Sequence, residues 1–268
     1  MLVVVAAEPH DQAKTRDHFR RLGAATITLR DVGQDRILVY GGPFNDRTAL
    51  EVADELRLLG WPADARPEAG GHLKAWQAHT APITAGRLLV CFPWSECDRN
   101  QTEIAIEIDP GRAFGSGSHP TTHLLLKVLA ESIKGGETLL DVGCGSGVLA
   151  IAAARLGAQV TATDIAPEAI KATEANAKRN HVETTVHVTD TPINQLPGTF
   201  DVIVANIEAH TLRLLAPAIQ AHLKRRGWLA LSGLSPAQLS KVAAAYNHLH
   251  VASTLHQEDW SALIATRG

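Results

Sequence analysis

The chain has 268 residues, of which 45% are hydrophobic and 20% are charged, so it can bury the core of one large domain, or of a large and a small one. Its formal net charge is −3, and no block of like charges appears along the chain. This composition excludes a strongly basic nucleic-acid binder and a disordered acidic tail, and we expect no direct contact with nucleic acid.

The apolar run at the start of the chain indicates where the protein is located. The apolar run over residues 2–7 ends at Glu8, so it is too short for a signal peptide or a membrane span and predicts a strand. We therefore expect a cytoplasmic protein without membrane contact.

The chain has an odd number of cysteines, namely Cys91, Cys97 and Cys144, and they do not show the spacing of metal ligands. This argues against a disulfide framework or a structural zinc. The histidines form no HExxH motif, and no metal site is predicted.

Residues 1–65 predict a small α+β domain of ferredoxin-like type. The expected elements, in chain order, are a strand over 2–7, a polar helix up to Leu22, strands over 25–30 and 36–40, and a helix that Asn45 caps and Gly60 ends. Pro67, Gly70 and Gly71 then indicate a linker, which we place at residues 66–86.

Residues 87–268 predict a second, larger α/β domain. After two β runs, over 87–92 and 103–108, strands and helices alternate strictly, which is typical of a mainly parallel, doubly wound sheet. The expected strands are 138–142, 159–163, 185–188, 201–205 and 228–232, followed by short runs near 248–255 and 261–266. The last two runs leave no room for a helix between them, so we expect an antiparallel hairpin at one edge of the sheet.

A glycine-rich turn is the strongest local signal in the chain. The strand over 138–142 runs into Gly143-Cys144-Gly145-Ser146-Gly147 and then into an apolar helical stretch. Gly143, Gly145 and Gly147 give the backbone the freedom to approach a ligand closely, and the helix N-terminus offers free N–H groups. In an open α/β sheet, ligands bind beyond the carboxyl ends of the strands, where this turn lies.

Two carboxylates indicate which ligand the turn binds. Asp141 stands at the start of the turn, where it can meet a cationic amino group, and Asp164 follows the next strand, where ribose hydroxyls would lie. No lysine follows the turn, so a P-loop is excluded. Two other interpretations remain open at this point, namely a nicotinamide-dependent dehydrogenase and glycines that serve helix packing alone.

The DVGCGSG turn together with Asp164 resembles the motif pair of class I S-adenosylmethionine-dependent methyltransferases. That resemblance implies a seven-stranded sheet with a reversed last strand. It also implies S-adenosylmethionine as the cofactor, with the turn around its amino-acid part and the acid on its ribose.

A narrower resemblance lies upstream of the turn. The segment 109–122, DPGRAFGSGSHPTT, is similar to the DPGxAFGTGTHPTT segment of the PrmA family, methyltransferases that act on protein eleven of the large ribosomal subunit. The segments after 204 and around 231 also resemble that family. Ser116 and Ser118 depart from its usual threonines, and Glu208 stands where the family generally has leucine.

The resemblance implies roles for particular residues and a partner. The expected cofactor-binding residues are Thr122, Asp141, Gly143, Gly145, Gly147, Asp164 and Asn206. From its position after the third strand, Asp190 is also expected to bind the cofactor, at the adenine edge, and a solvated turn acid is the alternative. Asn206 is also the predicted catalytic residue, because its amide oxygen or the adjacent carbonyls can orient the lone pair of an incoming amine. The implied reaction is methylation of lysine or α-amino groups of ribosomal protein eleven, and residues 1–65 are expected to recognise this substrate. We expect the protein to be a monomer.

Some alternatives stay open. The same fold could methylate another protein's lysines or a non-protein acceptor, although position 206 does not begin the Asn-Pro-Pro-Tyr motif expected for amino groups of bases and for glutamine side chains. A catalytically silent binding module is a third class. His119 can act as a base or cap the helix that Pro120 begins, Phe114 can cover the cofactor or fill the core, and Trp76 and Trp94 indicate packing between domains.

Overall fold

The computed structural model describes residues 2–7, 12–22, 24–33, 36–44, 49–58, 63–66, 82–97, 104–109 and 119–268. The chain divides into two compact units, Met1–His79 and Thr80–Gly268.

The smaller unit has the element order of a split βαβ motif. Its elements are β1 (Leu2–Ala7), α1 (Gln12–Arg21), β2 (Ala24–Gly33), β3 (Arg36–Phe44), α2 (Ala49–Leu58) and β4 (Ala63–Arg66). They form a four-stranded sheet of order β2-β3-β1-β4, in which β1 is antiparallel to both of its neighbours. Val3 and Val5 alternate along β1 and share a core with Phe19 of α1 and Val52 and Leu56 of α2. The predicted cap Asn45 lies outside the described residues.

The larger unit begins with a small three-stranded sheet. Strand β5 (Ile83–Ala85) is antiparallel to β6 (Leu88–Cys91), and β6 is parallel to β7 (Ile104–Glu107). Part of the segment predicted as a linker therefore forms β5. The side chain of Arg87 donates to the carbonyl oxygens of Ala130 and Ile133 at 2.9 and 2.7 Å, which attaches this sheet to the helix that follows.

The main sheet of the larger unit has seven strands in the order β10-β9-β8-β11-β12-β14-β13. The strands are β8 (Thr138–Val142), β9 (Gln159–Thr163), β10 (Val186–Thr189), β11 (Phe200–Asn206), β12 (Leu223–Leu234), β13 (His250–Gln257) and β14 (Trp260–Thr266). All neighbouring pairs are parallel except those of β14, which is antiparallel to β12 and to β13. The predicted doubly wound sheet with a terminal antiparallel hairpin is thus confirmed.

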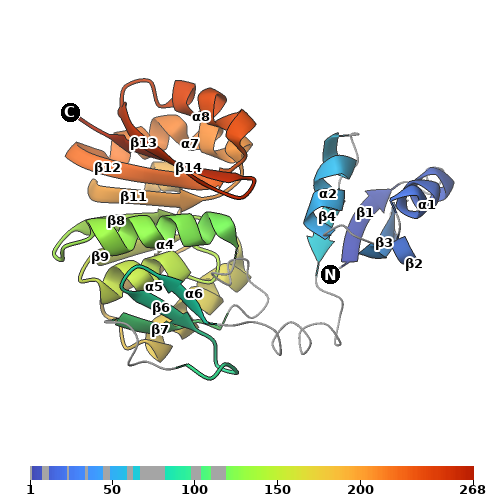
Figure 1. Ribbon diagram of the computed structural model, residues 1–268, viewed down its shortest axis with the longest axis horizontal. Coiled ribbons are helices and arrows are strands. Elements are labelled where there is room, and N and C mark those ends of the chain that lie inside the picture. Colours follow the sequence, from blue (N-terminus) through green and yellow to red (C-terminus); the bar gives the residue numbers. More distant parts are fainter. Residues whose placement is uncertain are drawn as a thin grey trace. The chain divides into compact units, whose positions relative to one another are not determined.

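Helices cover both faces of this sheet (Figure 1). On one face lie α4 (Pro120–Ser132), α5 (Val148–Arg155) and α6 (Pro167–Arg179), and on the other α7 (Ala209–His222) and α8 (Leu239–Ala245), with the short 3-10 helices η3 (Ile193–Gln195) and η4 (Pro236–Gln238). Successive residues of β8 face opposite cores, because Leu139 packs with α4 and α5 while Leu140 packs with α7. Asp141 therefore points to the α5 side.

A disulfide joins Cys91 and Cys97, which the cysteine count did not predict. The turn after β6 brings their Cα atoms to 6.0 Å, a distance that a disulfide can span. Cys144 is a free, buried thiol.

Within the described part of the chain, no helix is long and apolar enough to cross a membrane. The same residues contain no group of three or more His, Cys, Asp and Glu side chains arranged to hold a metal ion.

Candidate active site

The glycine turn joins β8 to α5 in a conformation that favours glycine. Gly143, Gly145 and Gly147 have φ angles of +77°, +57° and +82°, which L-residues with side chains rarely adopt. Gly147 is the N-cap of α5. The N–H groups of Gly143 and Cys144 both donate to the Thr163 carbonyl at the end of β9, at 2.8 and 3.1 Å. The turn is thereby fixed to the neighbouring strand.

Two of these glycines also allow a close approach of other segments. A Cβ atom at Gly143 would lie 2.5 Å from Cγ2 of Ile207, and one at Gly147 would lie 2.7 Å from Cγ2 of Thr173. The turn therefore packs directly against the end of β11 on one side and against α6 on the other.

Asp141 is a fully buried carboxylate beneath the turn. Its Oδ2 accepts a hydrogen bond from the Ala150 N–H of α5 at 3.1 Å, whereas Oδ1 has no partner among the described residues. Burial raises the pKa of Asp141 to about 7; the Ala150 hydrogen bond opposes this shift, and the nearby charge of Asp164 adds to it. A buried carboxylate oxygen without a partner is costly, and a cationic ligand group would relieve that cost.

Asp164 follows β9 and holds the backbone around it. Its Oδ2 accepts from the Gly145 N–H at 3.0 Å and its Oδ1 from the Ala166 N–H at 2.9 Å. Each carboxylate oxygen has two lone pairs, so both retain capacity for a ligand hydroxyl. The predicted cofactor acid is thus linked directly to the glycine turn, and it remains partly exposed.

Thr122 and Asn206 meet although 84 residues separate them in the chain. The Asn206 Nδ2 group at the end of β11 donates to Thr122 Oγ1 in the first turn of α4, at 2.9 Å. Thr122 is buried and Asn206 is half-buried. Because the Asn206 amide nitrogen is used in this bond, its oxygen faces elsewhere and makes no hydrogen bond within the described residues.

These groups gather at one edge of the sheet. Ala205 of β11 pairs with Val142 of β8, so the glycine turn and Asn206 leave neighbouring strands at the same level. The strand order reverses between β8 and β11, and such a switch point is where open α/β sheets bind ligands. Asp190 follows β10 at the same edge and is exposed. Phe114, Ser116, Ser118 and Trp76 lie outside the described residues.

His119 caps α4, as one of its two predicted roles requires. Its Nδ1 accepts from the Thr121 N–H at 3.4 Å and lies 2.8 Å from Thr121 Oγ1. The ring stands edge-on to Trp260, with centroids 4.7 Å apart. Burial lowers the pKa of His119, and the charge of Glu258 opposes this shift. Glu208, the departure from the family pattern, is exposed at the N-cap of α7.

Trp94, predicted to pack between domains, stacks on Phe92 within its own unit, with ring centroids 5.6 Å apart.

Two residues near the turn, Asn176 and Ile165, were not predicted from the sequence. Asn176 is a buried amide in α6 that bonds to both the N–H and the carbonyl of Asp109 and also to the Ser146 carbonyl, at 2.8 to 2.9 Å. A second buried asparagine, Asn180, follows one helical turn later, and this i, i+4 pair on an apolar face was the available signal. Ile165, next to Asp164, is 91% exposed, which is unusual for so large an apolar side chain.

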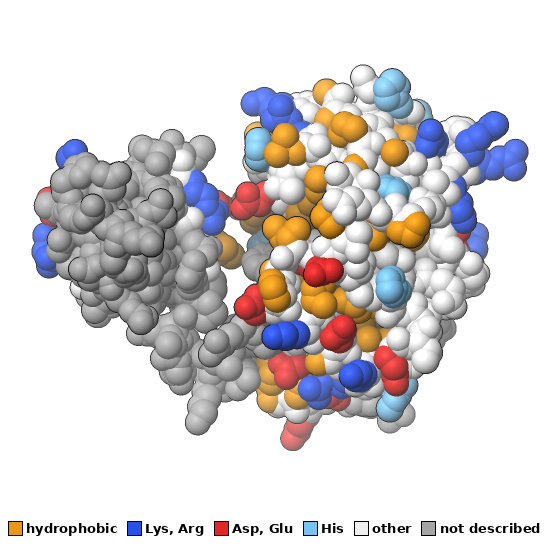
Figure 2. All heavy atoms as spheres, turned by 180° about the vertical axis from the view of Figure 1, so that it is seen from behind, with side chains coloured by type: hydrophobic (Ala, Val, Ile, Leu, Met, Phe, Trp, Pro, Cys, Tyr) orange, Lys and Arg blue, Asp and Glu red, His pale blue; other side chains and the backbone are white. Residues whose placement is uncertain are grey.

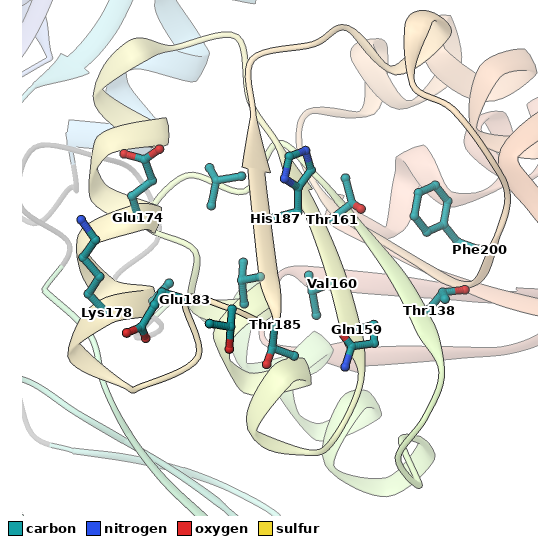
Figure 3. A pocket seen from close by; sticks show the side chains of 14 residues that line it. Thr138, Gln159, Val160, Thr161, Glu174, Lys178, Glu183, Thr185, His187 and Phe200 are labelled. Atoms are coloured by element: carbon teal, nitrogen blue, oxygen red, sulfur yellow. The ribbon is translucent and has the colours of Figure 1, made fainter.

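A cavity of about 590 Å³ lies elsewhere, along β9, β10 and α6 (Figure 3). Thr138, Gln159 and Phe200, which line it, are the first residues of their strands, so this cavity belongs to the amino ends of the sheet. Glu174 and Lys178 project from α6 beside it. Because ligands of open α/β sheets bind at the carboxyl ends, the glycine turn and not this cavity is the candidate site.

The surface agrees with the mixed composition. On the face of the larger unit shown in Figure 2, acidic and basic side chains are interspersed among hydrophobic ones.

The fold is that of class I methyltransferases, with seven strands of which β14 is reversed, and this chain has a glycine turn after β8 and an acid after β9. Comparison with known proteins agrees. A solved structure of a ribosomal protein L11 methylase from Lactobacillus delbrueckii subsp. bulgaricus is 35% identical, with a TM-score of 0.65 over 70% of this chain and 99% of that one.

The family model for ribosomal protein L11 methyltransferase (PrmA) matches residues 71–268. A protein of that name from Citrifermentans bemidjiense is 42% identical over 196 residues, which cover 70% of this chain but 64% of the relative. Another, from Burkholderia lata, is 33% identical over 298 aligned positions, covering 99% of this chain and 97% of the relative. The chain belongs to the PrmA family.

Proposed function

We propose that this protein transfers methyl groups from S-adenosylmethionine to lysine or α-amino groups of ribosomal protein L11. The observation that carries the proposal is the hydrogen-bonded pair Thr122–Asn206 beside the glycine turn at the switch point of the sheet. The names of the family and of its relatives support L11 as the substrate.

The residues present fit the cofactor. The partnerless Oδ1 of Asp141 suits the cationic amino group of its amino-acid part, and Asp164 suits the ribose hydroxyls. The exposed side chain of Ile165 offers an apolar surface beside Asp164 for the flat adenine ring, and Asp190 offers an acceptor for its edge. When bound, the cofactor supplies a methyl group on an electrophilic sulfonium.

On the acceptor side, the chain's own residues orient the amine. Thr122 fixes the Asn206 amide through Nδ2, so that Oδ1 can accept an N–H from the incoming amine and direct its lone pair. Displacement at a methyl group needs in-line alignment, and alignment of this kind can supply much of the rate enhancement. The amine must arrive without its proton, and a desolvated site favours the neutral form. Asn206 positions the nucleophile and takes no proton.

We assign substrate recognition to residues 1–65, because the methyltransferase residues account for the larger unit and the smaller one is a separate compact body. A cytoplasmic location fits a ribosomal substrate.

A panel of acceptors tests this function. Purified L11, an unrelated lysine-rich protein and RNA would each be incubated with the protein and S-adenosylmethionine that carries a labelled methyl group. We expect label on L11 alone, and no label on L11 when the Asp164→Ala variant replaces the wild-type protein. Label on the lysine-rich protein but not on L11 would refute the assigned substrate. Label on RNA would refute the amine acceptor, and failure to bind the cofactor would refute the activity itself.

A further inference from the structure

The disulfide between Cys91 and Cys97 lies in a turn that other contacts already fold. The Ser95 N–H donates to the Phe92 carbonyl at 3.0 Å, and Ser95 Oγ accepts from the Phe92 N–H at 2.9 Å. Phe92 and Trp94 stack within the same turn. These contacts do not involve sulfur, so they can keep the two cysteines within reach of each other in the reduced form, and the disulfide adds a covalent restraint to the end of β6.

The two cysteines differ in accessibility. Cys91 is buried at the end of β6, whereas Cys97 is half-buried in the turn. Thiol–disulfide exchange begins on the more accessible sulfur, so Cys97 is the first to react and Cys91 is the resolving thiol.

The third cysteine is chemically inert by comparison. Cys144 is buried in the glycine turn, and burial raises the pKa of its thiol to about 12. Its sulfur also accepts from Thr173 Oγ1 at 3.3 Å. Since the thiolate is the reactive form, Cys144 provides an internal control for oxidation at the other two.

A chain of hydrogen bonds leads from the disulfide to the glycine turn. The Cys91 carbonyl accepts from the Ile108 N–H at 2.9 Å, which fixes the strand end that precedes Asp109. Asn176 then bonds to both backbone groups of Asp109 and to the Ser146 carbonyl inside the glycine turn. The position of the β6 end is thus transmitted through one buried amide to the backbone that would face the cofactor.

We propose that Cys91 and Cys97 form a reversible dithiol–disulfide site, oxidised by low-molecular-weight disulfides, whose closed form strengthens cofactor binding by fixing β6, Asp109 and the glycine turn. The coupling rests on the proposed function, whereas the redox site does not. In the reaction, the Cys97 thiolate attacks the small disulfide and releases one thiol. The Cys91 thiolate then attacks Cys97 Sγ and releases the second. Two electrons pass to the small disulfide, and the two protein thiol protons end on the released thiols.

The redox site is tested by counting thiols in the full chain. The protein would be incubated with oxidised glutathione or with dithiothreitol, alkylated after denaturation, and weighed. We expect one alkylated cysteine after oxidation and three after reduction, with alkylation of the native reduced protein sparing Cys144. Three alkylated cysteines under both conditions would overturn the proposal.

The coupling is tested by titrating both forms with S-adenosylmethionine in a calorimeter. Reduction should weaken binding about five-fold, the low end of typical couplings between sites. Cys97→Ser should show the weaker affinity in either condition. Equal affinity of the oxidised and reduced wild type would overturn the coupling. Absence of binding in both forms would instead refute the proposed function, and the coupling with it. The redox site would still be tested independently by the number of alkylated cysteines.

Discussion

Asp141→Asn should stabilise the cofactor-free protein at neutral and alkaline pH. Burial is the main cause that raises the pKa of this carboxyl from 3.8 to about 7. Between these values the folded chain holds a proton that the unfolded chain has released, so stability falls as the pH rises through that window. Above pH 7 Asp141 is ionised in both the folded and the unfolded chain, so its contribution to stability is fully lost. The pKa difference corresponds to roughly 4 kcal/mol.

This figure already includes the hydrogen bond from the Ala150 N–H, which favours the charged form and so lowers the pKa. Asparagine keeps an acceptor for that N–H, as the protonated carboxyl does. We therefore expect the free energy of unfolding of Asp141→Asn to exceed that of the wild type by roughly 4 kcal/mol at pH 8. Near pH 4 the two proteins should agree within about 1 kcal/mol, because the wild-type carboxyl is then protonated in the folded state.

Urea denaturation of both proteins between pH 4 and pH 9 measures this difference. Asp259→Asn removes the same charge from an exposed side chain and should change stability by less than about 0.5 kcal/mol. In the same series, cofactor affinity of Asp141→Asn should fall about ten-fold or more, because a charge-assisted contact is lost. A variant no more stable than wild type at pH 8 would refute the electrostatic reasoning.

Three further substitutions, one of them with a control variant, probe the site and the fold. Asn206→Ala should lower turnover roughly 100-fold while leaving the melting temperature unchanged, and near-normal turnover would exclude the positioning role. Gly143→Ala should cost at least about 2 kcal/mol of stability, because a positive φ and a clash with Ile207 act together. In Gly198→Ala the φ is also positive but nothing lies near, so a cost below that of Gly143→Ala is expected, and equal costs would exclude the clash. Tyr246→Phe removes a buried bond to the Leu212 carbonyl and should cost about 1 kcal/mol in denaturation without affecting methyl transfer; an unchanged stability would contradict this value.

The sheet and the turn could be predicted because their signals are local. Apolar runs separated by helical patterns mark the strands. The positive φ angles at positions 143 and 147 favour glycine, so the turn is visible in the sequence as Gly143 and Gly147. The start of β12 was less visible. This strand begins at Leu223, whereas the prediction began at Trp228, because Lys224, Arg225 and Arg226 interrupt the apolar run.

Contacts between distant segments could not be derived from local pattern. The bond between Thr122 and Asn206 exists because α4 packs on the sheet against β12, β14 and β11, which is a property of the topology. Asn176 likewise shows its role only when α6 is placed beside Asp109 and Ser146. The disulfide depends on a turn whose geometry the spacing of Cys91 and Cys97 does not specify.

Intact-mass analysis of ribosomal protein L11, after incubation with this protein and S-adenosylmethionine, tests whether L11 is the substrate. We expect mass increases of whole methyl groups with the wild type, and none with Asp164→Ala. An unchanged mass of L11, although the protein binds S-adenosylmethionine, would contradict the assigned substrate.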